Sequence, residues 1–271
     1  MHGQNNFINT PLAIDKTFLL SLIPNLILGF QQKDFLSAES ILEKAEKRIE
    51  MQAASFQSNG ADQYPVILEI NGPIMKYSTW YYLGTQDIIR IIQRLDANPQ
   101  VSGIIFKIDS GGGMVSGTAE LTETIKNLTT PAIAYTNGYM CSAAMDIASG
   151  ADYRMANPHA DMIGSIGTMM SYQDYAAMFE KWGATIYELY APQSTEKNKE
   201  FRELQEGNKE AYEERLRVLT DEFIGRMKIN LSESIQDDGL VFKGKTYSPK
   251  EALAVGLINE LGSLEDALNK F

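Results

Sequence analysis

The chain has 271 residues, one cysteine and a formal net charge of −11. This length can bury one substantial core, so a single domain with appended arms is expected rather than several domains. The acidic balance argues against nucleic acid or an anionic membrane surface as a partner, and the lone cysteine excludes an internal disulfide framework, which favours a reducing, cytoplasmic location.

The first part of the chain is interpreted as a helical arm. Residues 18–30 are apolar, but this run is too short to span a bilayer and is interrupted by Pro24. We therefore expect a segment that packs against the body or a neighbouring subunit, with no membrane span. Helical periodicity over 37–55 is followed by the polar stretch FQSNGADQYP, which has the composition of a linker. The predicted division is an N-terminal helical arm and linker over 1–64 and one domain over 65–271.

From Pro65 onward the sequence alternates between β-rich and helical patterns. This order is typical of an α/β fold whose parallel sheet is connected by crossover helices. A later segment, residues 208–231, has charges at helical spacing and an apolar stripe, which predicts a helix with one solvated face. The predicted strands are 65–75, 101–113 and 131–139, the predicted helices are 84–100, 115–130 and 142–151, and a strand-turn unit is expected over 152–167.

Three consecutive glycines lie in the stretch DSGGGMVSG, residues 109–117, between a predicted strand and a predicted helix. Backbone amides in such a loop can face a phosphate or an oxyanion. The loop lacks both the Gly-Lys-Ser/Thr ending of a phosphate loop and the GxGxxG spacing of a dinucleotide site, so no cofactor is expected. A tight turn without a ligand remains the alternative at this point.

A single serine, Ser142, stands in the stretch GYMCSAAMDIASGAD among small and apolar residues. It is either a nucleophile or a small hydroxyl at a helix-packing position, and the stretch alone does not decide between them. The adjacent Cys141 is interpreted as a small buried apolar residue, so no metal or redox site is expected there.

Five motifs occur in a characteristic order along the chain: NGPIM, DSGGGMVSG, GYMCSAAMDIASGAD, NPHADMIGSIG and SPKEALAVGLINELGSLEDAL. In this order they resemble the signal peptide peptidase A family of Ser-Lys serine peptidases, which includes the head-maturation (prohead) proteases of tailed phages. The resemblance covers about residues 65–268 and implies a crotonase/Clp-protease-like fold of stacked βαβ units. It implies that Ser142 is the nucleophile and that the amides of Gly112, neighbouring Gly113 and Ala143 form the oxyanion hole.

A serine nucleophile needs a base, and the sequence offers few. His2 lies in the arm and His159 in a predicted turn, so a Ser-His-Asp triad is not expected. The resemblance implies a lysine some fifty residues after the serine, and Lys197 has that spacing, with Lys199 as the alternative. It also implies that Ser165 orients the lysine amine. Either lysine could instead be a solvated loop charge.

The resemblance implies a serine endopeptidase that acts on protein or peptide substrates and assembles as a homo-oligomer. The favoured interpretation is a prohead protease that cleaves scaffold and capsid proteins, in the host cytoplasm or the prohead interior. A cellular protease of the signal-peptide-peptidase type is the first alternative. A crotonase-like structural component without peptidase activity is the second.

Overall fold

The computed structural model describes residues 12–14, 38–58, 60–79, 81–172, 174–185, 187–232 and 234–271. The expected docking segment at 18–30 and His2 lie outside the described residues. The elements in chain order are β1 (Leu12–Ile14), α2 (Ala38–Ser58), β2 (Tyr64–Asn71), α3 (Thr85–Asp96), β3 (Val101–Ser110), β4 (Gly112–Met114), α4 (Thr118–Lys126), β5 (Ala132–Cys141), α5 (Ala143–Ser149), β6 (Tyr153–Ala156), β7 (Ile163–Gly164), α6 (Ala176–Lys181), α7 (Lys199–Gln205), α8 (Glu210–Asn230), η1 (Val241–Lys243), β8 (Thr246–Tyr247), α9 (Pro249–Ala254), β9 (Glu260–Leu261) and α10 (Leu264–Leu268).

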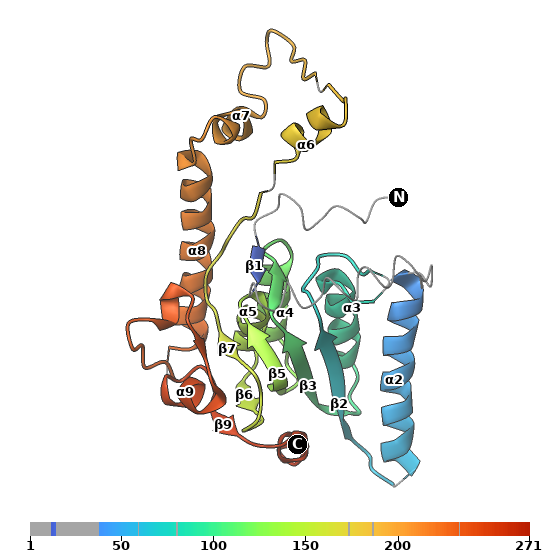
Figure 1. Cartoon of the computed structure of the whole chain (residues 1–271). Helices are drawn as coiled ribbons and strands as arrows, with labels where there is room; N and C mark the ends of the chain where they lie inside the picture. The colour runs from blue at the N-terminus through green and yellow to red at the C-terminus, as the bar shows by residue number, and fades with distance from the viewer. Residues whose placement is uncertain are drawn as a thin grey trace.

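The strands form a largely parallel sheet in the order β2-β3-β5-β6-β9 (Figure 1). Strand β7 pairs with the end of β5, and the short β8 adds to β7 in the antiparallel direction. The central strand β3 is apolar and buried on both faces, as expected for a parallel strand with elements packed on both sides. The predicted α/β class with crossover helices is confirmed.

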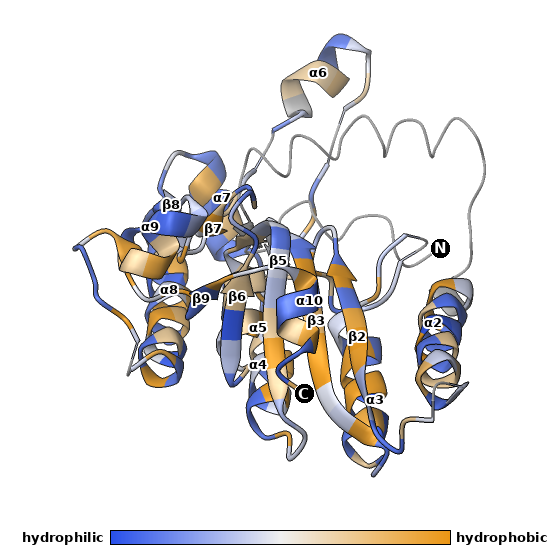
Figure 2. Cartoon of the chain, turned by 90° about the horizontal axis from the view of Figure 1, so that it is seen from below, coloured by the Kyte–Doolittle hydropathy of each residue, from blue (hydrophilic) through white to orange (hydrophobic). Residues whose placement is uncertain are grey.

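The two faces of the sheet carry separate apolar clusters. Alternate residues of β3, such as Ile104 and Phe106, pack with α3, α4 and α5 in the main core. Ile105 faces the other side, where α10 and Phe271 cover it. Figure 2 shows the apolar character of β2 and β3, with α10 and the C-terminus in front of the sheet. Helix α3 ends at Asp96, earlier than the expected 84–100, because Pro99 restricts the residue before it and cannot continue the helix.

The helix expected over 37–55 is α2, which flanks the edge strand β2 (Figure 1). The side-chain amide of Gln52 accepts from the backbone N–H of Ile67 at 2.9 Å and donates to its C=O at 3.0 Å. These two bonds satisfy backbone groups that an open sheet edge would leave to water. Apolar side chains of α2 pack against the main core, and the division at residues 64 and 65 stays a prediction.

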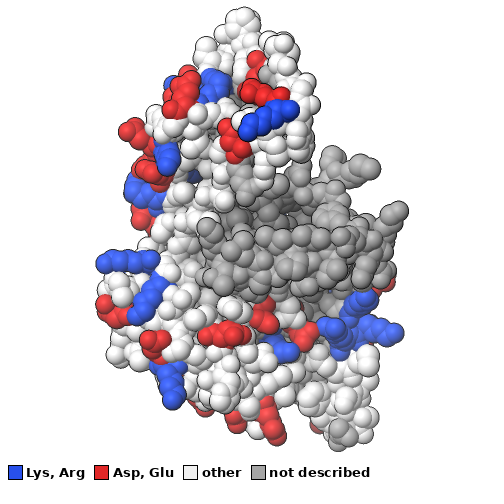
Figure 3. Space-filling model, in the orientation of Figure 1, with Lys and Arg blue, Asp and Glu red and all other residues white. Residues whose placement is uncertain are grey.

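Helices α6, α7 and the upper part of α8 form a projection away from the sheet (Figure 1). Phe223 and Met227, in the lower half of α8, are buried in the core and fix the base of the projection. On the face drawn in Figure 3, acidic and basic side chains are interspersed. None of the helices in the described ranges combines the length and the apolarity that a bilayer span requires.

Candidate active site

Ser142 occupies the junction between β5 and α5, as the residue that precedes the first turn of the helix. Its backbone has φ 57° and ψ −120°, a region that residues with a side chain rarely adopt. The surroundings hold this conformation: Ser142 N–H donates to Gly164 C=O at 2.7 Å. A serine on a strained turn from a strand into a helix is the arrangement of a nucleophile elbow, whereas a packing hydroxyl needs no such strain.

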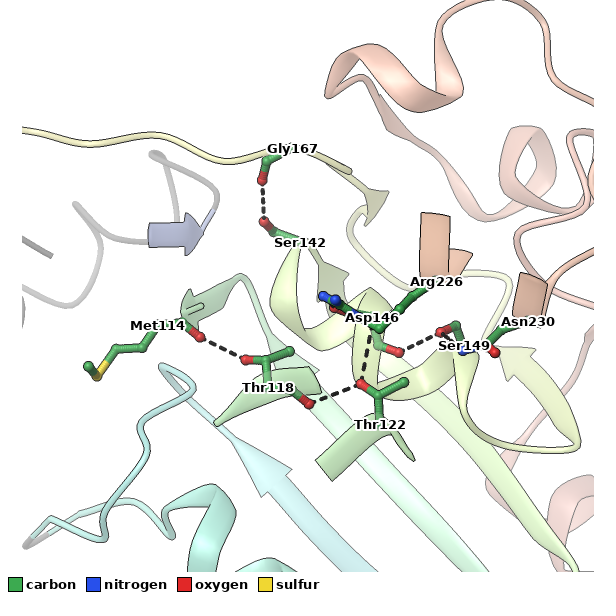
Figure 4. A network of polar contacts seen from close by, with 9 residues as sticks. All are labelled: Met114, Thr118, Thr122, Ser142, Asp146, Ser149, Gly167, Arg226 and Asn230. Carbon is green, nitrogen blue, oxygen red and sulfur yellow. Dashed lines mark hydrogen bonds and ion pairs between the residues drawn. The ribbon is translucent and has the colours of Figure 1, made fainter. Parts of the chain in front are cut away.

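The Ser142 side chain is almost completely buried, with 1% of the residue exposed. Its Oγ lies 3.4 Å from Gly167 C=O, to which the hydroxyl donates a long hydrogen bond (Figure 4). A long bond to a neutral carbonyl leaves the hydroxyl able to rotate toward a base. The segment around Gly167 follows β7 and therefore forms one wall of the site.

The glycine loop predicted over 109–117 lies beside this junction, because Ser110 at the end of β3 is in register with Met140 near the end of β5. Gly112 has φ 104°, which favours glycine. A Cβ on Gly113 would lie 2.1 Å from the backbone oxygen of Ile74. The loop therefore requires glycine at both positions. Gly112 is required for its backbone conformation, and Gly113 is required because the backbone of Ile74 leaves no room for a Cβ.

Two backbone amides near Ser142 are suited to hold an oxyanion. Ala143 is the first residue of α5 and is fully buried, so its N–H has no acceptor within the helix. Gly112 N–H donates in this structure to the Oγ of Ser110 at 3.1 Å. A hydroxyl oxygen is a replaceable acceptor, and a negatively charged oxygen would compete with it through a stronger, charge-assisted bond. The arrangement is chemically suited to stabilise the oxyanion of an acyl-transfer step.

A buried polar network anchors α5 to α8 (Figure 4). Asp146, one turn after Ser142, pairs with Arg226 of α8 at 2.7 Å and accepts a hydrogen bond from Thr122 at 3.3 Å. Burial raises the pKa of Asp146, and Arg226 and Thr122 oppose that rise. On the next turn, Ser149 accepts from the amide of Asn230 at 3.0 Å. The network fixes the helix that begins at the candidate nucleophile.

Sequence reasoning missed this network. The signal was present in an aspartate that interrupts the small and apolar run CSAAMDIAS, where a charged residue on a buried helix face requires a partner. Its partner could not be identified, because Arg226 is separated from Asp146 by 80 residues and belongs to a helix with many charges.

The structure does not bring the candidate lysines to Ser142 within one chain. Lys197 and Lys199 are both exposed, and the amine of Lys199 pairs with Glu196 at 3.1 Å. Lys199 begins α7, which lies in the projection and far from the β5–α5 junction in Figure 1. His159 is exposed in a turn between β6 and β7, as expected. For Lys197 or Lys199 to act on Ser142, the projection would have to rearrange or another subunit would have to supply the lysine.

Ser165 lies on the wall formed by the segment after β7. It has φ 55°, and its N–H donates to Lys245 C=O at 2.8 Å. It is partly buried and is separated from Gly167, the partner of Ser142 Oγ, by one residue. The expected role of Ser165 in orienting a lysine amine stays a prediction.

Comparison with known proteins identifies the family. The model of peptidase family S49 matches residues 125–271, more than half of the chain, and this region includes Ser142 and the segment after β7. The chain belongs to peptidase family S49. The resemblance inferred from the sequence motifs is thereby confirmed.

Relatives within the family are of both expected types. Capsid assembly protease C of Escherichia phage lambda is 30% identical over 223 residues, which cover 80% of this chain and 50% of the relative. A putative signal peptide peptidase SppA of Enterococcus faecium is 24% identical over 273 residues, which cover 93% of this chain and 76% of the relative. The aligned region spans only part of several relatives. It covers 62% of a putative protease of Methanocaldococcus jannaschii, 50% of the lambda protease and 37% of the head-tail preconnector protein GP5 of Enterobacteria phage P21.

Among solved structures, a mutant of the 1510-N membrane-bound stomatin-specific protease superposes with a TM-score of 0.51 at 19% identity. The match covers 78% of this chain and 85% of that chain. At this identity the likeness concerns the fold. It agrees with the predicted α/β fold around a parallel sheet.

Proposed function

We propose that this chain is a serine endopeptidase in which Ser142 attacks the carbonyl carbon of the scissile peptide bond. The observation that carries the proposal is the strained backbone of Ser142 at the turn from β5 into α5, within a family of peptidases. The amides of Gly112 and Ala143 hold the oxyanion, with Gly113 fixing the loop against Ile74. The base takes the proton of the Ser142 hydroxyl and passes it to the leaving amine as the peptide C–N bond breaks. Water then hydrolyses the acyl-enzyme, which releases the acid and restores the Ser142 hydroxyl.

The proposed base is the amine of Lys197, with Lys199 as the alternative, and Ser165 positions that amine. A lysine accepts a proton only when it is neutral, and an exposed amine at neutral pH is charged. The base therefore requires a site with less water than either lysine has in a single chain. Docking of the projection against a second subunit supplies such a site.

An assembly of this kind is supported by the surface of the projection. Large apolar side chains are exposed along it, in a region where a monomer would leave them in water. We propose that the active form is a homo-oligomer in which the lysine of one subunit reaches the serine of its neighbour. The exposed residues are Tyr175, Met178, Phe179, Trp182, Tyr187 and Leu189.

The proposed substrates are scaffold and capsid proteins during phage head maturation. The lambda relative, a capsid assembly protease, supports this proposal. A second candidate is a signal-peptide-peptidase function, which the putative SppA of Enterococcus faecium favours because its match extends over nearly the whole chain. Incubation with a candidate scaffold protein and, separately, with a released signal peptide distinguishes the two.

The first test measures cleavage of an unstructured protein substrate by three purified chains: the wild type, Ser142→Ala and Cys141→Ala. Ser142→Ala should abolish turnover while retaining the wild-type circular dichroism spectrum. Cys141→Ala is the matched control, because it truncates the adjacent buried side chain at the same junction and should retain turnover. Retained turnover by Ser142→Ala would contradict the proposed mechanism.

A second test concerns the shared site. Ser142→Ala and Lys197→Ala chains, each inactive alone, should regain part of the activity when they are mixed and reassembled, because some interfaces then combine an intact serine with an intact lysine. Light scattering and differential tagging establish that mixed oligomers have formed. Mixed oligomers without activity would rule out a lysine supplied by the neighbour.

A further inference from the structure

The N-terminal strand β1, labelled in Figure 1, pairs antiparallel with β4, the strand of the glycine loop. The register places Leu12 opposite Met114, Ala13 opposite Gly113 and Ile14 opposite Gly112. Because Gly112 carries a proposed oxyanion amide, β1 lies directly on the strand that a substrate would have to approach.

The other edge of β4 is already occupied. Ile74 N–H donates to Gly112 C=O at 2.9 Å, and Met114 N–H donates to Ile74 C=O at 2.8 Å. Successive peptide groups of a strand point to opposite edges, so the N–H and C=O of Gly113 face away from Ile74 and toward Ala13. This edge offers one donor and one acceptor to an extended backbone, as in recognition by strand addition.

The direction of β1 is also that of a bound peptide. It runs antiparallel to β4, and its last residue, Ile14, lies opposite Gly112. An extended substrate in this orientation would carry its carbonyl toward the proposed oxyanion glycine. Neither Gly112 nor Gly113 has a side chain that would keep a backbone away from this edge.

We propose that β1 is an intrachain occupant of the edge of β4 that binds substrate backbone, so that Leu12–Ile14 must leave before an extended peptide can pair with Gly113. The arm thereby holds the peptidase in a self-blocked state until assembly or a competing substrate displaces it. The proposal rests on the proposed function in naming the displaced ligand a substrate, whereas the pairing itself and its competition with a peptide do not require catalysis.

The test uses full-length chains that carry Ser142→Ala, so that no turnover is needed. Ala13→Pro removes the N–H that faces Gly113 C=O, and Ile14→Pro is the matched control because the N–H it removes points away from β4. The probe is a fluorescein-labelled synthetic peptide, FINTPLAIDK, that copies residues 7–16. Fluorescence anisotropy measures its binding to the parent chain and to each variant.

Occupancy of the edge by β1 reduces the apparent affinity by the fraction of molecules in which the edge is vacant. The Ala13→Pro chain should therefore bind the peptide at least about tenfold more tightly than the parent and the Ile14→Pro chain. Amide hydrogen exchange at Gly113 should be slow in the parent and in Ile14→Pro and fast in Ala13→Pro. Equal affinity in all three chains, or fast exchange at Gly113 in the parent, would overturn the proposal.

The outcome is separable from that of the proposed function. If a chain that carries Ala13→Pro and retains Ser142 cleaves no substrate, although Ala13→Pro increases peptide binding and exposes Gly113, the self-blocking strand stands and the peptidase assignment fails. If cleavage depends on Ser142 but Ala13→Pro changes neither readout, the peptidase assignment stands and the self-blocking strand fails.

Discussion

Replacing Arg226 with methionine should destabilise the fold, because it leaves the carboxylate of Asp146 buried without its cation. The Asp146 side chain is 2% exposed and lies 2.7 Å from Arg226, whose side chain is 20% exposed. Breaking a buried pair from one side costs about 3–5 kcal/mol, and the partial exposure of Arg226 favours the lower end, about 3 kcal/mol. For a chain of this size that corresponds to a fall of about 6–12 °C in the unfolding midpoint.

The assay is thermal unfolding followed by circular dichroism, with Arg217→Met as the matched control on the same helix. Arg217 pairs with Glu214 and Asp221, but all three side chains are 60% exposed, so its removal should leave the midpoint close to that of the wild type. The double variant Asp146→Asn, Arg226→Met should regain much of the loss, because it removes the unpaired charge.

The pH dependence has a definite sign. Burial raises the pKa of Asp146 above its ordinary value, and Arg226 opposes that rise, so Arg226→Met should raise the pKa further. A carboxyl with a higher pKa in the folded state than in the unfolded state binds its proton preferentially when folded. The Arg226→Met defect should therefore shrink as the pH falls from about 8 to about 5. Equal midpoints for Arg226→Met and Arg217→Met at all pH values would refute the role of the buried pair.

Three further predictions concern the site. Ser142→Gly should unfold about 2–4 °C above Ser142→Ala in thermal scans, because glycine adopts a φ of +57° without strain, and a lower midpoint for Ser142→Gly would contradict the strained turn. Gly113→Ala should destabilise by about 1–3 kcal/mol in urea unfolding, because its Cβ would lie 2.1 Å from Ile74 O, and wild-type stability would contradict that contact. Lys197→Ala should remove nearly all peptidase activity, whereas Lys199→Ala should remove little of it. Neither variant should lose stability, because both side chains are exposed. The reverse ranking of the two activities would assign the base to Lys199.

Much of the fold could be predicted because local pattern and tertiary structure agree. The apolar run of β3 predicts a strand buried on both faces, and the periodicity of 208–231 predicts a helix, observed as α8 (Glu210–Asn230). Ser142 and the glycine loop could be singled out as candidates because short motifs around them carry the family resemblance, and the structure places both at the ends of strands. Their positions are fixed by the parallel register of β3 with β5.

The remaining features depend on contacts between distant segments. The three-residue strand β1 has no recognisable pattern, and its partner lies about one hundred residues away in the chain. The hydrogen bond from Gly112 N–H to Ser110 Oγ depends on a side-chain rotamer that no sequence pattern specifies. The position of Lys197 depends on how the projection packs. The sequence between α6 and α8 gives the number of residues that separate Lys197 from Ser142, but it does not show which surface this segment contacts.

The most direct test of Ser142 as the nucleophile is covalent labelling of the native protein with a fluorophosphonate probe, followed by peptide mass spectrometry. Ser142 should be the one modified residue in the native protein, and it should carry no label when the protein is denatured before labelling. Ser142→Ala should remove the label altogether. Labelling of Ser110 or Ser165 in place of Ser142, or a native, substrate-cleaving preparation that carries no label on Ser142, would contradict the assignment of the nucleophile.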